Sequence, residues 1–398
     1  MSNKKNIKMN IKLIKSSFYN EQETKNKLCD FIQGAEQLSI WKYCSQFEKD
    51  YATWQQRKYC VFFNSWSSAN LALIQSMLNM WKLNLGDKVW FSSLSWSTNV
   101  MPLIQLWLEA IPVDVELNTL NISLDTFKII VKENNIKCLF ITNLLWFCDN
   151  IDEIEKYCNE NNILLLEDNC ESMWTVYKWK KLWNYSLAST FSTFVWHHMS
   201  TIEWWMVCTD DKELYIMLNM VRAHWWDRNL PINIQNEVRE KYGVDKSFYS
   251  KYTFYTLWYN LRPNEITWFL WCEQVKFLDE IVDKRIVNFK DFVNAVNLNN
   301  DFYNLKYDHI EKLSNFAIPV ICKSIDILEK YIDIFNKNSI EIRPIVWWDL
   351  TQQIFWKNTY WENKVKTNAK LIHEQWFYFG NSPEYTSEEI DLIISCLK

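Results

Sequence analysis

The segment KCLFITNLLWFCDNIDEIEKYCNENNILLLED, residues 137 to 168, decides the fold class. Two apolar runs, 137–145 and 162–168, have the length of strands. Between them, over 150–162, apolar residues recur three and four positions apart. Such short runs are typical of buried strands, and the wider spacing is typical of an amphipathic helix. The order strand, helix, strand indicates two parallel strands joined by a crossover helix.

The same alternation extends over residues 58–209. The further apolar runs are KYCVFF, KVWFSS, IPVDVE, ASTFST and MVCT, and helical spacing recurs in ANLALIQSMLNM and SLDTFKIIVKENN. We therefore predict an α/β fold whose large α/β/α domain holds a mostly parallel seven-stranded sheet. A long helical stretch over 266–296 and a smaller α/β part, with strands near FAIPVIC and IEIRPIV, follow.

We expect three regions along the chain: an N-terminal extension over 1–24, a large cofactor-binding domain over 25–260 and a small C-terminal domain over 261–398. The lysine-rich first dozen residues are expected to lie loose. No internal repeat and no low-complexity linker divides these regions.

The composition disfavours several classes of protein. A net charge of -5 over 398 residues gives no electrostatic basis for binding nucleic acid. The eleven cysteines form no CxxC pair, which is typical of reduced thiols in the cytoplasm. No stretch of about 18 apolar residues occurs. We expect a soluble cytoplasmic protein with neither nucleic acid nor a membrane as a partner.

The glycine and tryptophan contents are abnormal. Glycine makes up about 7% of residues on average, yet this chain has 4 glycines and 24 tryptophans. Many tryptophans stand where a turn favours glycine, as in SWSSAN, YKWKKLW and TLWYN. We hypothesise that the gene comes from an organism that reads UGA as glycine, so that most of these tryptophans are glycine in the native protein. The alternative is a genuinely tryptophan-rich protein, and the intact mass of natively expressed protein distinguishes the two.

NSWSSAN, residues 64 to 70, lies between a predicted strand and a predicted helix. If Trp66 stands for glycine, backbone N–H groups and the hydroxyls of Ser67 and Ser68 converge at a helix N-terminus, where the helix dipole favours an anion. This arrangement predicts a phosphate ligand. The alternative is a serine-rich helix cap without a ligand.

Two further segments end predicted strands with side chains suited to a flat ring. NILLLEDNCES, residues 162 to 172, runs into Asp168 and Glu171, and ligands of open α/β sheets bind beyond the carboxyl ends of strands. A carboxylate there pairs with a protonated pyridine nitrogen, although such a strand end is as often a helix cap or a structural ion pair. In LSWSTN, residues 94 to 99, Trp96 either stacks on a heterocycle or packs in the core.

Together these segments resemble the DegT/DnrJ/EryC1 family of sugar aminotransferases, which are fold type I pyridoxal-phosphate enzymes. The likeness extends from about residue 25 to the C-terminus. It is carried by LSWSTN, LLLEDNCESM, TFSTFVWHHMSTIEWWMV, VRAHWWDRNLP, LWYNLRPNEITWFLWCEQ and IEIRPIV. Within the family, the chain is most similar to the lysine-lacking dehydratases that act on GDP-linked 4-keto-6-deoxy sugars.

The resemblance implies a site for pyridoxal 5'-phosphate or pyridoxamine 5'-phosphate. The implied cofactor-binding residues are the Trp66 amide, Ser67, Ser68 and Thr193 at the phosphate, Trp96 on the ring face, Asp168 at the ring nitrogen, Glu171 over the ring or beside Asp168, and Asn260 at the phosphate of the partner subunit's cofactor. The last of these implies a homodimer with shared active sites. His224 and Arg228, in RAHWWDR, would face the amino donor or the nucleotide sugar.

FVWHHMSTIEWW, residues 194 to 205, departs from the aminotransferases of the family. His198 stands where they have the Schiff-base lysine, and no lysine occurs between Lys181 and Lys212. An imidazole forms no covalent link to the cofactor, but it moves protons near neutral pH. His198 is therefore the implied catalytic residue, and the neighbouring His197 is expected to be structural.

The implied reaction is a dehydration rather than a lasting amino transfer. L-glutamate would convert the cofactor to its pyridoxamine form, and the 3-hydroxyl of a nucleotide-linked 4-keto-6-deoxy sugar would then be lost, with release of ammonia. The resemblance points to GDP-4-keto-6-deoxymannose as the substrate and to deoxysugar biosynthesis for lipopolysaccharide O-antigens as the role.

Three alternatives stay open. The first, a nucleotide-sugar aminotransferase, needs a lysine from elsewhere in the fold. The second is a 3-dehydratase of CDP- or TDP-linked sugars. Enzymes of that group that hold an iron–sulfur cluster need several cysteines after the RAHWW segment, and none falls between Cys208 and Cys272, so we expect no cluster and no other metal. The third is a catalytically silent binding homologue, in which His198 is a core histidine.

Overall fold

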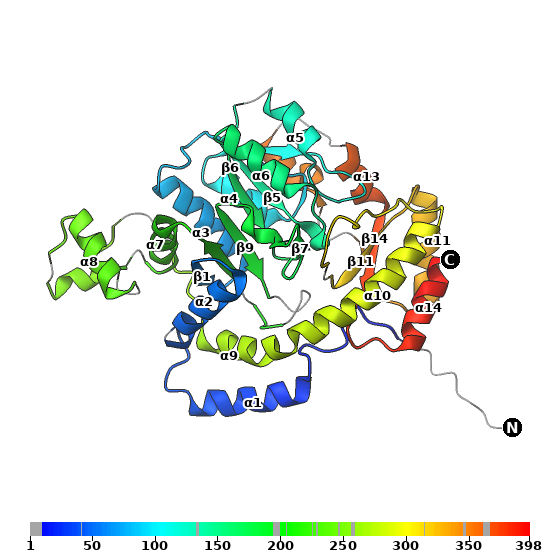
Figure 1. Ribbon diagram of the computed structural model, residues 1–398, viewed down its shortest axis with the longest axis horizontal. Coiled ribbons are helices and arrows are strands. Elements are labelled where there is room, and N and C mark those ends of the chain that lie inside the picture. The colour runs from blue at the N-terminus through cyan, green and yellow to red at the C-terminus, as the bar shows by residue number, and fades with distance from the viewer. Residues whose placement is uncertain are drawn as a thin grey trace.

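The computed structural model describes residues 10–40, 42–132, 135–193, 200–203, 205–224, 226–227, 230–245, 247–255, 259–313, 315–344, 348–360 and 367–398. These residues form a seven-stranded sheet, a three-stranded sheet and two two-stranded sheets, with helices around the two larger ones (Figure 1). Among the described residues, no helix combines the length and the apolar character needed to cross a lipid bilayer.

Seven strands form the large sheet. In spatial order they are β1 (Tyr59–Phe63), β10 (Trp205–Thr209), β9 (Ala188–Ser192), β6 (Leu164–Asp168), β5 (Cys138–Thr142), β2 (Lys88–Ser92) and β4 (Glu109–Val113). The pairs from β9 to β4 are parallel, and β10 is antiparallel to both of its neighbours. The predicted mostly parallel seven-stranded sheet is confirmed, and each predicted apolar run of the large domain overlaps one of its strands.

Helices cover both faces of this sheet (Figure 1). Residues of α3 (Trp66–Asn79), α4 (Ser97–Gln105) and α7 (Lys212–Arg222) belong to one buried cluster, and residues of α2 (Lys42–Gln55), α5 (Leu124–Val131) and α6 (Ile151–Glu160) belong to another. Within β5, Leu139 and Cys138 point into opposite clusters, because successive side chains of a strand alternate. Both faces are buried, which is why these strands appear as uninterrupted apolar runs.

The smaller part contains a second sheet, in the order β11 (Ala317–Ile321), β14 (Trp376–Gly380) and β12 (Ile342–Pro344). The predicted long helical stretch is α9 (Glu265–Gln274) and α10 (Leu278–Leu298), separated by a short 3-10 turn. The other elements are α1 (Glu21–Gly34), α8 (Ile232–Lys241), α11 (Ile325–Lys337), α12 (Ile354–Thr359), α13 (Thr367–Gln375), α14 (Ser387–Leu397), β3 (Leu94–Ser95), β7 (Val176–Tyr177), β8 (Lys180–Lys181) and β13 (Trp348–Asp349).

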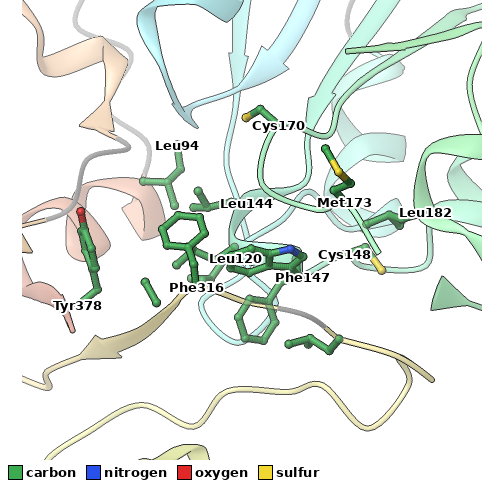
Figure 2. Close-up of a cluster of buried hydrophobic side chains, with 14 of the residues drawn as sticks. Leu94, Leu120, Leu144, Phe147, Cys148, Cys170, Met173, Leu182, Phe316 and Tyr378 are labelled. Atoms are coloured by element: carbon green, nitrogen blue, oxygen red, sulfur yellow. The ribbon is translucent and has the colours of Figure 1, made fainter. Parts of the chain in front are cut away.

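An apolar cluster joins the two parts beside the carboxyl ends of the parallel strands. Figure 2 shows Leu144 and Phe147, which follow β5, together with Phe316 and Tyr378 from the small part. The Trp146 ring meets the Phe316 ring edge to face, with 4.8 Å between centroids. Because this cluster is continuous with the core of the large sheet, the small part is attached directly at the edge where strand ends meet. The predicted domain boundaries stay a prediction.

The N-terminal segment is anchored in the small part. Ile11 forms a parallel bridge with Ile340, and the backbone N–H of Leu13 donates to the Glu341 carboxylate at 3.0 Å. The side chains of Ile11 and Leu13 are buried. The expectation that the first dozen residues lie loose is therefore wrong at Ile11. That expectation rested on the nearby lysines, whereas burial of the apolar Ile11 side chain stabilises its place in the small part.

Among the residues that the structure describes, five tryptophans occupy the left-handed region of backbone conformation. They are Trp81, Trp107, Trp146, Trp174 and Trp179, with φ angles of 58°, 61°, 71°, 88° and 63°. In this region the Cβ atom of an L-residue crowds the backbone, so glycine is favoured. Three of the five side chains are also largely exposed, at 81% for Trp81, 77% for Trp107 and 89% for Trp179, so burial does not offset the strain. That these positions are glycine in the native protein stays a prediction.

Replacing Trp107 by glycine is expected to stabilise the fold. The turn between α4 and β4 holds this residue at φ 61°, and relief of the Cβ clash outweighs the added chain entropy of glycine by roughly 0.5–1 kcal/mol. The free energy of unfolding in urea measures the effect. Trp107→Ala is the matched control, since it removes the same indole but keeps the Cβ atom. An equal gain in both variants would mean that the indole, rather than the backbone conformation, is the cause.

Candidate active site

Asp168 is the centre of the polar cluster at the carboxyl edge of the large sheet. It ends β6, between β5 and β9, and is fully buried. Its Oδ2 atom accepts three side-chain N–H groups: Trp66 Nε1 at 2.8 Å, Asn70 Nδ2 at 3.1 Å and Asn99 Nδ2 at 2.5 Å. Its Oδ1 atom accepts the backbone N–H of Cys170 at 3.0 Å. A buried carboxylate needs such donors, so Asp168 ties the first turns of α3 and α4 to the end of β6.

The indoles of Trp66 and Trp96 lie parallel at this carboxylate. Trp66 is the first residue of α3, and Trp96 is the residue before α4. Their rings are inclined by 7°, with 6.0 Å between centroids. The sequence predicted that the amide of Trp66 would contribute to a phosphate site, whereas its indole reaches Asp168 and Trp96, the two residues predicted to bind the ring.

The N-terminus of α3 is capped by serine hydroxyls. Ser65 accepts the backbone N–H of Ser68 at 3.2 Å, and the Oγ atoms of the two residues are 2.8 Å apart. Ser68 is buried by this contact, whereas Ser67 is exposed at the first turn. The helix cap considered as the alternative is therefore present. The phosphate role predicted for Ser67 and Ser68 stays a prediction, which their place at a helix N-terminus allows.

Glu171 and Thr193 are buried near the same sheet edge. Each accepts a hydrogen bond from a backbone N–H group. Glu171 Oε2 accepts the backbone N–H of Leu145 at 2.9 Å and so supports a turn in which Leu145 has a φ angle of 46°. The Thr193 and Thr201 hydroxyls lie 2.5 Å apart, and the Thr201 N–H donates to the Thr193 carbonyl at 3.0 Å. These threonines hold together the two ends of segment 194–199. Their predicted cofactor roles stay predictions.

Asn260 and His224 lie on two paired segments, where the His224 backbone N–H donates to the Tyr259 carbonyl at 3.0 Å. Asn260 forms a bridge with Ala223, is exposed, and accepts from Arg262 Nε at 2.9 Å. His224 has a φ angle of 57°, and its ring lies 4.6 Å from that of Trp226. His198, the predicted catalytic residue, and Arg228 lie outside the described residues.

Sequence reasoning missed Asn70 and Asn99. Both stand in the quoted motifs, Asn70 at the end of NSWSSAN and Asn99 at the end of LSWSTN. Asn70 is the fifth residue of α3 and Asn99 is the third residue of α4, and each is fully buried. The available signal was an amide shortly after the Ser-Trp pair of each motif, because a residue near the start of a helix that follows a strand lies close to the sheet edge.

Comparison with known proteins gives the family. Residues 19–398 match the DegT/DnrJ/EryC1/StrS aminotransferase family. The chain is 32% identical over 385 residues to a GDP-4-keto-6-deoxy-D-mannose 3-dehydratase of Escherichia coli O55:H7, covering 94% of this chain and 96% of that protein. It is 33% identical over 366 residues to a protein of the same name from Yersinia pseudotuberculosis, covering 89% and 90%.

A solved structure is similar over nearly the whole chain. It is a crystal structure of GDP-4-keto-6-deoxymannose-3-dehydratase with a trapped PLP-glutamate geminal diamine. The TM-score is 0.87 at 28% identity, covering 98% of this chain and 100% of that one. The expected fold and the expected family are thereby confirmed together.

Glu167, next to Asp168, points to the opposite face and has a structural role. It is fully buried and accepts from Asn143 Nδ2 at 3.1 Å and from the Tyr185 N–H at 3.3 Å. Burial raises the pKa of Glu167 to about 7, because a charged carboxylate is disfavoured away from water. The folded protein therefore keeps this proton at a pH where the unfolded chain, with its ordinary value of 4.5, has lost it.

Glu167→Gln is expected to remove part of the pH dependence of stability. Since the folded state binds more protons between pH 4.5 and about 7, this group lowers the free energy of unfolding as the pH rises through that window, by at most about 3 kcal/mol. An amide does not titrate, so the variant loses that slope. Urea unfolding at pH 5 and pH 8 measures it, with the exposed Glu153→Gln as control. An unchanged slope in Glu167→Gln would contradict the assignment.

Proposed function

We propose that this chain, which belongs to the DegT/DnrJ/EryC1/StrS aminotransferase family, is a pyridoxamine-phosphate-dependent 3-dehydratase. Its substrate is GDP-4-keto-6-deoxymannose, and its amino donor is L-glutamate. The proposal is supported by similarity to two proteins named for this activity. The similarity covers 94% of this chain for one of them and 89% for the other. The observation that carries it is the buried Asp168 carboxylate beside Trp96. This carboxylate accepts the indole N–H of Trp66, whose ring lies parallel to that of Trp96, and we propose that a pyridine ring makes the same two contacts.

The residues around Asp168 suit a pyridine ring that carries a phosphate. Asp168 accepts the ring N–H, Trp96 covers one face, and the N-terminus of α3 favours the phosphate anion. The Oδ1 atoms of Asn70 and Asn99 are buried and have no partner among the described residues, so they are acceptors suited to a hydroxyl or N–H of a ligand. The indole of Trp66 does not suit this cofactor, because it already makes the contacts with Asp168 and Trp96 that the pyridine ring would make.

His198 would carry the protons of the reaction. The bound cofactor supplies an electron-withdrawing ring. A neutral imidazole takes a proton from the reacting carbon, and the imidazolium then donates one to the departing 3-hydroxyl of the sugar. No lysine lies between Lys181 and Lys212, so no primary amine from this segment competes for the cofactor. This absence favours a cofactor that is held by noncovalent contacts.

The active sites are proposed to be shared between two subunits. Asn260 is exposed, and its backbone is fixed to Ala223 at the end of α7. In a homodimer its amide would reach the phosphate end of the partner subunit's site. His224 lies one residue further along and would face the amino donor or the nucleotide sugar, as would Arg228.

The decisive experiment is a balance of the products. Parent chain and Trp66→Gly variant are each incubated with pyridoxal 5'-phosphate, L-glutamate and GDP-4-keto-6-deoxymannose. Ammonia, 2-oxoglutarate and 3-deoxy sugar are expected in equal amounts from at least one of the two forms. Loss of the 3-hydroxyl is a two-electron reduction of the sugar, and oxidation of glutamate to 2-oxoglutarate supplies both electrons.

GDP-mannose, which lacks the 4-keto group, is the matched control and should release no ammonia. If 2-oxoglutarate forms while the nitrogen stays on the sugar, the protein is an aminotransferase and the proposal is wrong. Cofactor binding without conversion of the 4-keto sugar would likewise contradict it.

His198→Lys is expected to lower ammonia release by at least about 100-fold, the usual contribution of general acid–base catalysis. A lysine would hold the cofactor covalently and favour retention of nitrogen on the sugar. The ratio of ammonia to amino sugar, measured by mass spectrometry of the nucleotide sugars, checks this in whichever form is active. His197→Gln is the control, with a much smaller expected change. Unchanged dehydration in His198→Lys would remove His198 from the mechanism.

A further inference from the structure

The indole of Trp66 makes the contacts that the site offers to a cofactor ring. We propose that this side chain is an internal occupant of the ring site, and that residue 66 decides whether the site admits the cofactor. The inference rests on the proposed function, because the cofactor class comes from there. It concerns binding alone and makes no claim about the sugar.

The first contact is the hydrogen bond to Asp168. The indole Nε1 donates to Asp168 Oδ2 at 2.8 Å, and the same oxygen also accepts from Asn70 and Asn99. The other carboxylate oxygen accepts the Cys170 backbone N–H. A carboxylate offers about two acceptor directions on each oxygen, so a further ring N–H finds no free direction on Oδ2. A protonated pyridine nitrogen that binds Oδ2 therefore has to displace the indole.

The second contact is with Trp96. The Trp66 indole lies parallel to it, within 7°, at 6.0 Å between centroids. A ring that stacks on Trp96 from the side of Asp168 meets this indole. Because one indole makes both contacts, a rotation that frees only the carboxylate or only the aromatic face does not open the site. The whole side chain has to leave.

Residue 66 lies at the first position of α3, where its side chain adds nothing to the helix cap. The cap is made by Ser65 and Ser68. Removal of the indole therefore leaves the N-terminus of α3, Asp168 and Trp96 in place. Without the indole, Oδ2 keeps Asn70 and Asn99 as donors, and a ligand N–H in the place of the Trp66 Nε1 atom restores the same set of three donors. These features distinguish Trp66 from the amides of Asn70 and Asn99, which lie further along their helices.

Equilibrium dialysis with pyridoxamine 5'-phosphate tests the inference. Trp66→Gly and Trp66→Ala are expected to bind it at least about tenfold more tightly than the parent chain. Trp66→Ala separates loss of the indole from the backbone freedom of glycine. Trp179→Gly is the matched control, because this tryptophan is 89% exposed in the turn between β7 and β8 and is expected to leave the affinity unchanged. Circular dichroism verifies that each variant is folded.

Thermal unfolding gives an independent readout, since a ligand raises the unfolding temperature only of a protein that binds it. The ligand should raise that temperature in both Trp66 variants and much less in the parent chain. Equal binding by all forms overturns the inference, and so does failure of both folded variants to gain affinity. A variant that gains affinity but converts no nucleotide sugar contradicts the proposed function and supports the inference.

Discussion

The arrangement of the site depends on one buried carboxylate. Asp168 has no access to water, so its charge is tolerated only because N–H groups surround it. One donor is the backbone N–H of Cys170, two residues after Asp168. The others are side chains near the starts of α3 and α4. The end of β6 and the starts of two helices are thereby fixed against one another. A binding site at the carboxyl edge of a parallel sheet needs this rigidity, because its parts come from segments that are far apart in the sequence.

The sequence predicted the layers of the fold much better than the connections between them. Each strand of the large sheet is buried on both faces, so its apolar run is visible without any knowledge of its neighbours. Helix α4 was not predicted because it contains Pro102, and proline is not typical of a helix interior. The pairing of Leu13 with Glu341 joins residues 328 positions apart. Contacts at that distance depend on the finished fold, and local patterns do not record them.

The same difference between local patterns and long-range contacts holds for the candidate site. Asp168 and Trp96 were singled out because each follows a predicted strand, and in the structure both contact the indole of Trp66. Asn70 and Asn99 were missed because an amide has no distinctive chemistry until a buried charge lies beside it. Trp66 was expected to act through its amide, and its indole instead reaches Asp168. That outcome depends on the side chain that is present, since the helix N-terminus is the same for any residue at this position.

The two ends of the site are physically separable, and Trp66 shows this. Its indole is flat and carries one N–H, which are the properties that a protonated pyridine ring shares, and so it satisfies Asp168 and Trp96. It carries no negative charge and contributes nothing at the N-terminus of α3, where Ser65 and Ser68 pair with each other instead. An anion attracted by the helix dipole gains from the second end alone. A ligand that has both a ring N–H and a phosphate would gain from both ends at once, and under the proposed function this sum would hold a cofactor that no covalent bond retains.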